Sequence, residues 1–294
     1  MCPPRSNIPS MRIRLHFLSL LPLATLIGCS LPYTPAPQTI TGNWQIQAGS
    51  AITSPPNTYP SFLGAIQVQG TQATGIFTTV ESAGTTGQPV EYSGAFDSST
   101  EDVSLATFGS RFDFTPPATP HTIVPVGVTG GCVYPPTYTG PECLAIFMVP
   151  SVGVEIAPLN GTYSGSLTGT LNSDSQTTPI SGTATLVLTQ SSTPNASGQF
   201  PLTGTITFPS SSGMSPVTLP GLISGTPIWL NNELCVPPFS EYAPCTLASP
   251  TGSNLNAYTN PTATQITVTN LINFTPSGNG GETSVSLTGI LTLQ

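Results

Sequence analysis

Ionisable side chains are scarce in this chain of 294 residues. Asp, Glu, Lys and Arg together make up 5% of it, against about a quarter in an ordinary soluble protein. There is no lysine, and the only arginines are Arg5, Arg12, Arg14 and Arg111. Helical bundles and coiled coils need Ala, Glu, Lys and Leu in register, so this composition excludes them. Nucleic-acid binding draws on Lys and Arg to neutralise phosphates, so the composition argues against a nucleic-acid partner as well.

Small and hydroxylated residues fill the place of the missing charges. The chain contains 45 Thr, 33 Ser, 29 Gly and 33 Pro, which is nearly half of it. Disordered chains share this richness in Gly, Pro and Ser, but they are poor in apolar residues. This chain is 37% hydrophobic with a mean hydropathy of +0.15. We therefore expect an exported, turn-rich, all-β protein whose strands form an antiparallel barrel or a sandwich.

The first 29 residues have the pattern of an export signal. Arg12 and Arg14 precede a short apolar stretch, Leu15–Gly28, which is too short to span a membrane. The stretch ends in Leu26-Ile27-Gly28-Cys29-Ser30, which resembles the lipobox of bacterial lipoproteins. The resemblance implies that Cys29 is lipidated, becomes the new N-terminus and anchors the protein to the membrane. An ordinary signal peptide cut nearby is the alternative.

The resemblance also implies a location. In bacterial lipoproteins the residue after the lipidated cysteine influences sorting, and Ser30 is typical of delivery to the outer membrane. The chain up to residue 10 looks like an over-long start, so Met11 is an alternative first residue. Residues 30–39 are rich in proline and predict a stiff tether between the membrane and the folded part.

One short pattern recurs along the rest of the chain: an apolar residue, then Ser, Thr or Asn, then Gly, then any residue, then another apolar residue. Because side chains alternate along a strand, the apolar residues and the glycine share one face, which predicts that the glycines face the core. Such glycines are typical of a strongly curved or closed sheet. The eight glycines are Gly42, Gly75, Gly94, Gly161, Gly169, Gly182, Gly204 and Gly289.

Longer runs of alternating apolar residues and threonines predict strands with one buried face and one solvent-exposed face. Leu202, Gly204, Ile206 and Phe208 alternate with threonines, and Ile266 and Val268 do the same further along the chain. Threonine suits the solvent side of such a strand because it favours β-structure without carrying charge.

The chain after the tether reads as two similar halves, 40–157 and 158–294, which form two domains or one. Each half carries a proline-rich loop between two cysteines, at separations of 11 and 10 residues. In an exported protein we expect these cysteines to be oxidised. Of the three connectivities that four cysteines permit, we favour the two local disulfides, Cys132 with Cys143 and Cys235 with Cys245.

No catalytic, cofactor or metal motif stands out. His121 is the only histidine after the leader, so we expect no metal site and no cofactor. The densest acidic cluster is Asp97, Glu101 and Asp102, which predicts a hairpin turn between strands that end at Phe96 and begin at Val103. A loose calcium site and a carboxylate pair of a glycan hydrolase are the alternatives at these acids.

The segment Gly42-Asn43-Trp44 resembles the Gly-x-Trp that opens the first strand of lipocalins and other calycin barrels, and residues 40–50 are similar to the first strand of avidin-type barrels. The resemblance implies an antiparallel barrel with Trp44 as a core anchor near one end. It departs where ligands would bind, because Ile46 and Phe77 replace polar residues of avidins and no late arginine is present to stack on Trp44. A biotin site is therefore not implied.

Together these observations predict a non-enzymatic lipoprotein of the bacterial cell envelope with a structural or adhesive binding role. Its contacts would be the membrane, through the anchor, and an envelope protein or a glycan. A small-ligand carrier with an apolar barrel interior is the first alternative, and a carboxylate-dependent glycan hydrolase is the second.

Overall fold

The computed structural model describes residues 40–53, 61–80, 87–107, 110–129, 132–133, 144–145, 151–173, 176–231, 252–276 and 282–294. All of them belong to one compact unit, Pro37–Gln294. Cys29, Cys143, Cys235, Cys245 and the leader lie outside the described residues, and of Cys132 only the backbone is described. Within the described residues, no helix is long and apolar enough to cross a membrane.

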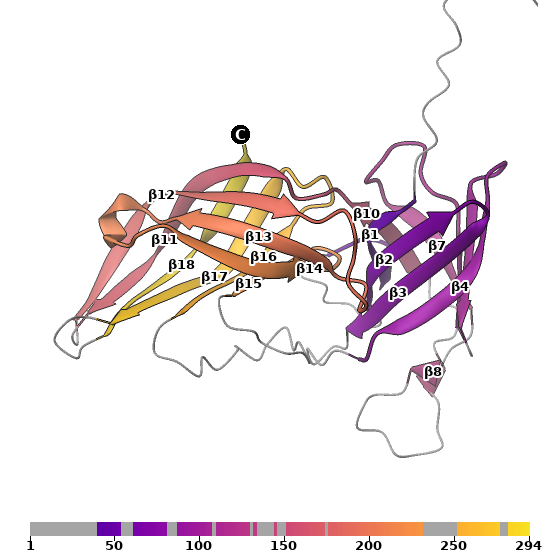
Figure 1. The fold of residues 1–294 in the computed structure, drawn as a ribbon, viewed down its shortest axis with the longest axis horizontal. Helices are drawn as coiled ribbons and strands as arrows, with labels where there is room; N and C mark the ends of the chain where they lie inside the picture. The colour runs from indigo at the N-terminus through magenta and orange to yellow at the C-terminus, as the bar shows by residue number, and fades with distance from the viewer. Residues whose placement is uncertain are drawn as a thin grey trace, which may run out of the picture. The chain divides into compact units, whose positions relative to one another are not determined.

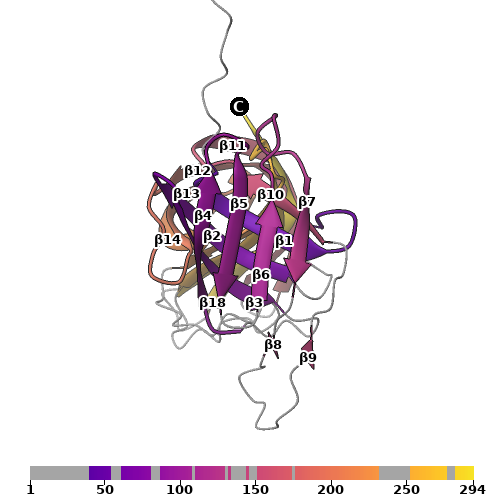
Figure 2. The same ribbon diagram turned by 90° about the vertical axis from the view of Figure 1, so that its right-hand side faces the viewer.

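The first half of the chain closes into a barrel of eight antiparallel strands, drawn from indigo to magenta in Figure 1. Around the barrel, β10 lies between β1 and β7, and each of the other strands lies beside the next along the chain; Figure 2 shows several of these neighbours side by side. A two-stranded pair, β8 (Cys132–Val133) and β9 (Leu144–Ala145), lies between β7 and β10 in the sequence. The barrel strands are β1 (Gly42–Ala48), β2 (Ser61–Gln69), β3 (Gln72–Val80), β4 (Val90–Asp97), β5 (Asp102–Thr107), β6 (Ser110–Phe114), β7 (Val124–Thr129) and β10 (Ser151–Ile156).

The second half forms another closed antiparallel barrel, in which every strand pairs with the next and β18 returns to β11. Its first two strands pair from Gly161↔Leu188 to Ser173↔Gln176. One short 3₁₀ turn, η1 (Ser210–Ser212), precedes β14. The strands are β11 (Gly161–Ser173), β12 (Gln176–Gln190), β13 (Phe200–Thr207), β14 (Val217–Ile223), β15 (Pro227–Asn231), β16 (Gly252–Thr259), β17 (Gln265–Pro276) and β18 (Glu282–Leu293).

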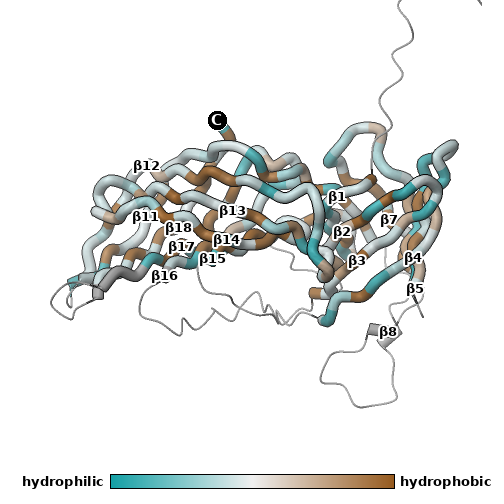
Figure 3. The backbone as a smooth tube through the Cα atoms, viewed as in Figure 1, coloured by the Kyte–Doolittle hydropathy of each residue, from teal (hydrophilic) through white to brown (hydrophobic). Residues whose placement is uncertain are grey.

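The predicted all-β class and the two similar halves are confirmed, and the architecture is the barrel rather than the sandwich. The alternation of wet and dry faces is confirmed along β13, where Leu202, Gly204 and Ile206 are buried and Thr203 and Thr207 are exposed. Figure 3 shows the same alternation as brown and teal bands along the strands of both barrels. Burial of one face of each strand is the main stabilising contribution to such a fold.

The two barrels are filled differently. Aromatic rings meet inside the first barrel: Phe112 lies 5.0 Å from Phe62, 5.6 Å from Phe77 and 4.8 Å from Tyr92, measured between ring centroids. Each such pair contributes about 0.5–1.5 kcal/mol beyond its buried area. The core of the second barrel is built mainly from aliphatic side chains such as Leu167, Leu186 and Leu230.

The recurring glycines serve two purposes, and the prediction that they face the core covers only one. A Cβ on Gly204 would lie 2.3 Å from Leu230 Cδ1, so this glycine does face the packed interior. A Cβ on Gly94 would instead lie 1.7 Å from the carbonyl oxygen of Ser104 on the paired strand β5, and Gly169 stands in the same relation to Ser286. At these positions glycine permits the close approach of a neighbouring backbone where the barrel wall bends.

Substitution of Gly94 by alanine tests this second purpose. Because the new methyl group would occupy the place of the Ser104 carbonyl, β4 and β5 must separate, and we expect Gly94→Ala to lower the free energy of unfolding by about 3 kcal/mol. Gly127→Ala on β7 is the control, since its Cβ would meet its nearest atom at an ordinary 3.4 Å. Urea denaturation measures both. Equal stability of the two variants would contradict the close-approach explanation.

Candidate functional site

The predicted acidic cluster is a hairpin turn, as expected, with β4 ending at Asp97 and β5 beginning at Asp102. The Asp97 carboxylate accepts hydrogen bonds from the Ser99 amide at 2.8 Å and the Ser99 hydroxyl at 2.6 Å, and these bonds lower the pKa of Asp97. Asp102 accepts a hydrogen bond from Thr115. The acids of this cluster thus serve an exposed turn, which gives no support to the hydrolase alternative at this position.

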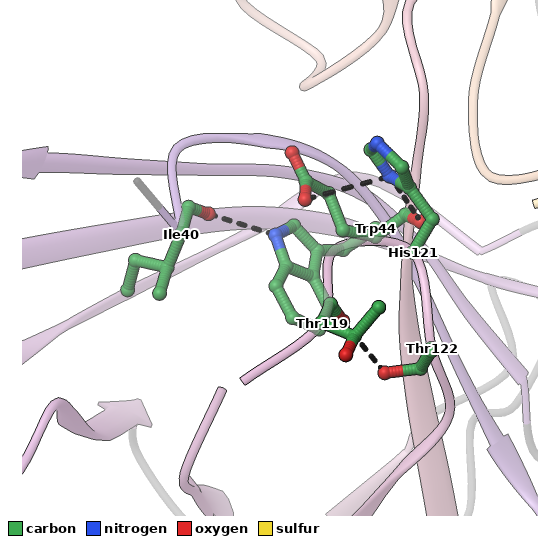
Figure 4. A network of polar contacts seen from close by, with 6 residues as sticks. Ile40, Trp44, Thr119, His121 and Thr122 are labelled. Carbon is green, nitrogen blue, oxygen red and sulfur yellow. Dashed lines mark hydrogen bonds and ion pairs between the residues drawn. The ribbon is translucent and has the colours of Figure 1, made fainter. Parts of the chain in front are cut away.

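His121 lies in a turn and contacts Glu155, an acid outside the predicted acidic cluster. It belongs to the segment between β6 and β7, and Glu155 lies on β10. In the register of β1 and β10, Glu155 stands opposite Trp44, so its side chain is on the inward face of the wall. In Figure 4 the Trp44 indole N–H donates to the Ile40 carbonyl oxygen, at 2.8 Å.

The histidine touches Glu155 twice through one nitrogen. His121 Nδ1 lies 3.6 Å from Glu155 Oε2 and 3.3 Å from the Glu155 carbonyl oxygen. Both side chains are mostly shielded, at 25% and 19% exposed. The carboxylate also covers Gly42, where a Cβ would lie 2.7 Å from Glu155 Oε1. Glycine at position 42 therefore provides the space that this acid occupies.

Burial controls the ionisation of Glu155. Removal from water disfavours the carboxylate and raises the pKa of Glu155 from its usual 4.5 to about 7. Near neutral pH Glu155 therefore changes between its neutral and its ionised form, with His121 Nδ1 3.6 Å from its carboxyl oxygen.

A second polar cluster joins the two barrels. Asn43 Nδ2 donates to the Gly225 carbonyl oxygen at 2.8 Å, and the Gly225 amide donates back to Asn43 Oδ1 at 2.6 Å. Gln45 Oε1 accepts from the amide and the hydroxyl of Thr226, at 3.1 and 3.0 Å. Gly225 and Thr226 lie in the turn between β14 and β15, so the first strand of one barrel binds a turn of the other. We call this set of hydrogen bonds the amide junction.

The amide junction extends along β1 to the segment that follows this strand. Gln45 Nε2 donates to Gln47 Oε1 and to the Thr53 carbonyl oxygen, both at 3.0 Å, and Gln47 Nε2 donates to Thr53 Oγ1 at 2.8 Å. Asn43, Gln45 and Gln47 are at most 2% exposed. Buried amides of this kind are stable only when their donors and acceptors are paired, and these hydrogen bonds pair them.

Sequence analysis missed both clusters, although each carries a signal. Most strands place Thr or Ser on their outward face, whereas β1 places Asn43, Gln45 and Gln47 there. Three amides at alternate positions mark a face that must be buried with partners. Glu155 is likewise an isolated acid in an otherwise apolar strand. Periodicity within one half of the chain cannot reveal which outward face the other half covers.

The two positions of this chain that correspond to polar residues of avidins are filled by packed apolar side chains. Ile46 and Phe77 belong to the core of the first barrel and are at most 1% exposed, and Trp44 packs on Phe114 with ring centroids 5.1 Å apart. The expectation that Trp44 is a buried anchor is confirmed. No group of three or more potential metal ligands occurs among the residues that the structure describes.

Comparisons with known proteins establish no family. No protein-family model and no curated protein matches the chain. A double mutant of transferrin-binding protein B from Haemophilus parasuis, a vaccine antigen, aligns at 12% identity over 81% of this chain and 54% of that chain, with a TM-score of 0.24. Intact Ap-TbpB, with its N and C lobes, aligns at 10% identity over 87% of this chain and 61% of that chain, again with a TM-score of 0.24.

The chain thus spans between half and two thirds of the length of these two proteins. A likeness at this TM-score carries no conclusion about architecture or binding partner, and the barrels rest on their own strand pairing.

Loss of the Asn43 side chain from the amide junction should lower the free energy of unfolding strongly. Asn43→Ala removes two buried hydrogen bonds and leaves both backbone groups of Gly225 without their side-chain partner, so we expect the free energy of unfolding to fall by about 2–4 kcal/mol. Asn172→Ala is the control. Asn172 is a partly exposed amide on β11 that accepts from Thr177 at 2.8 Å, and its loss should cost less than about 1 kcal/mol. Similar losses in both variants would contradict the assigned importance of the junction.

The raised pKa of Glu155 predicts that the folded protein loses stability as the pH rises. Its pKa is higher in the folded chain, about 7, than its usual 4.5, so the folded state binds the proton more tightly. The associated stability is fully present below pH 4.5 and is lost as the pH rises through 7, by up to about 3 kcal/mol. In Glu155→Gln the free energy of unfolding, measured by urea titration at several pH values, should vary less with pH over this interval. An unchanged slope in the variant would show that another group is responsible.

Proposed function

We propose that this protein is a non-enzymatic lipoprotein of the bacterial cell envelope that binds an envelope protein or a glycan with the outer surfaces of its two barrels. The observation that carries this proposal is the packing of the barrel interiors. The rings of Phe62, Phe77, Tyr92 and Phe112 contact one another inside the first barrel, where a carrier would hold its ligand. This packing disfavours the small-ligand carrier, and binding on the outer walls is the function that remains.

The character of the outer walls supports a specific mode of binding. Among the described residues of the second barrel, Glu282 at the start of β18 is the only charged one. Its outward positions are largely hydroxyls, such as Thr168, Thr183 and Thr288. Such a wall recognises a partner through shape and hydrogen bonds rather than through long-range electrostatic attraction.

The proposal includes the arrangement of the whole chain. Residues 1–29 would be the signal with its lipobox, with Met11 as the alternative start, and residues 30–39 the tether. Segments 40–157 and 158–294 would be the two β-domains, each with its local disulfide. The lipid on Cys29 would hold them at the outer membrane, because two or more acyl chains anchor a protein firmly where one does not.

Anchoring is tested by mass spectrometry of the mature N-terminus together with membrane fractionation. We expect the mature chain to begin at a diacylglyceryl-modified Cys29 and to sediment with outer membranes. Cys29→Ala should abolish the modification and release the protein from the membrane fraction. An unmodified N-terminus elsewhere, with membrane association unchanged by Cys29→Ala, would overturn the proposed anchor.

Binding by the outer walls is tested by chemical cross-linking in intact envelopes, followed by native mass spectrometry of the purified protein. We expect a cross-linked envelope component whose yield changes less than about twofold between 0.05 and 0.5 M salt, because the described walls carry few charges to be screened. A small molecule that co-purifies in a fixed 1:1 ratio, without any cross-linked component, would favour the carrier instead.

A further inference from the structure

The first barrel has a weak point at the seam where β10 closes against β7. Their pairing covers only Ser151↔Val126, Val152↔Pro125 and Gly153↔Val124. On the other side, β1 pairs with β10 as far as Ile156. The last residues of β10 therefore extend past the start of β7, and the chain that precedes β7 lies opposite them.

His121 occupies this place at the seam. Its Nδ1 lies 3.3 Å from the carbonyl oxygen of Glu155, a group that β7 does not reach, and 3.6 Å from the Glu155 carboxylate. The ring can donate to that carbonyl oxygen only when Nδ1 carries a proton. The same residue adopts a positive φ of 58°, a conformation that costs a non-glycine residue free energy and persists only when its surroundings hold it.

We propose that the His121–Glu155 contact is a pH-sensitive latch that holds residues 115–123 against the closing seam of the first barrel and releases them as the pH rises above neutrality. Below about pH 7 burial keeps the Glu155 carboxyl neutral, so its shielded position at the seam holds no charge. Above that pH the group becomes a shielded carboxylate, and the loss of hydration disfavours the closed seam. Release of residues 115–123 admits water to the carboxylate and relaxes the left-handed backbone at His121.

The described residues beside Glu155 bring no other charged group to it. On β1, Gly42 and Trp44 lie beside Glu155, and neither carries an ionisable side chain. On β6, Arg111 and Asp113 form their own ion pair at 2.7 Å, with both side chains more than a third exposed. Among the described residues, burial rather than a neighbouring charge is therefore the cause of the raised pKa of Glu155.

Hydrogen–deuterium exchange of the whole mature protein tests the latch directly. After correction for intrinsic exchange, we expect protection of amides in residues 115–124 to fall about tenfold between pH 6 and pH 8.5. The reason is that Glu155, whose pKa is about 7, passes from its neutral to its ionised form in this interval. The described part of residues 161–190, on β11 and β12, contains no Asp, Glu, His, Lys or Arg, and burial raises the pKa of Tyr163 above its usual 10, so these strands should keep their protection. That internal reference separates local release from global unfolding.

Two variants complete the test. Glu155→Gln keeps an uncharged group of the same shape at the seam and removes the carboxyl that ionises. Protection of residues 115–124 should therefore vary less than about twofold over this pH range. Asp113→Asn removes a carboxylate from the neighbouring strand and should leave the wild-type dependence intact. The latch is refuted if wild-type protection is independent of pH, or if it falls equally in Glu155→Gln. Because the wild-type measurement stands alone, failure of a variant to fold leaves the proposal testable.

Discussion

The arrangement of the protein depends on the buried hydrogen bonds that join β1 of the first barrel to the turn between β14 and β15 of the second. Apolar burial is not directional, so it would hold two barrels together in many orientations. Asn43 and Gln45 require donors and acceptors at fixed positions, and Gly225 and Thr226 supply them. Any slip at this contact would leave buried amides unpaired, which costs several times the free energy that a paired amide contributes.

Scarcity of charge follows from the same construction. Hydroxyl side chains cover much of the described outer walls, and rings or aliphatic side chains fill the interiors. The buried outer face of the first barrel combines the amides of β1 with apolar side chains such as Ala65, Val154 and Ile156. One acid among the described residues, Glu155, lies in a mostly shielded position, and burial has moved its pKa to about 7. A chain built in this way has little material for general acid–base chemistry, whereas a single shielded acid beside a histidine is well suited to sense pH.

Strand alternation and the repeated glycines were sufficient to predict an all-β chain, and the two proline-rich cysteine loops to predict two similar halves, because these signals are local. The hairpin at Asp97 was predictable for the same reason, whereas the buried position of Trp44 was implied by the resemblance to calycin barrels. The split purpose of the glycines was not, since whether a Cβ would meet a side chain or a neighbouring carbonyl depends on how the wall bends. Nor could the pairing of His121 with Glu155 be foreseen, because 34 residues separate them and only closure of the barrel brings them together.

Calorimetry of the mature protein tests most directly the claim that the amide junction joins the two barrels into one cooperative unit. If the junction couples them, heating should give a single transition in which the calorimetric and van 't Hoff enthalpies agree. Two resolved transitions in the wild-type protein, each with the enthalpy of one barrel, would contradict the account, because they would show that each barrel unfolds without regard to the other.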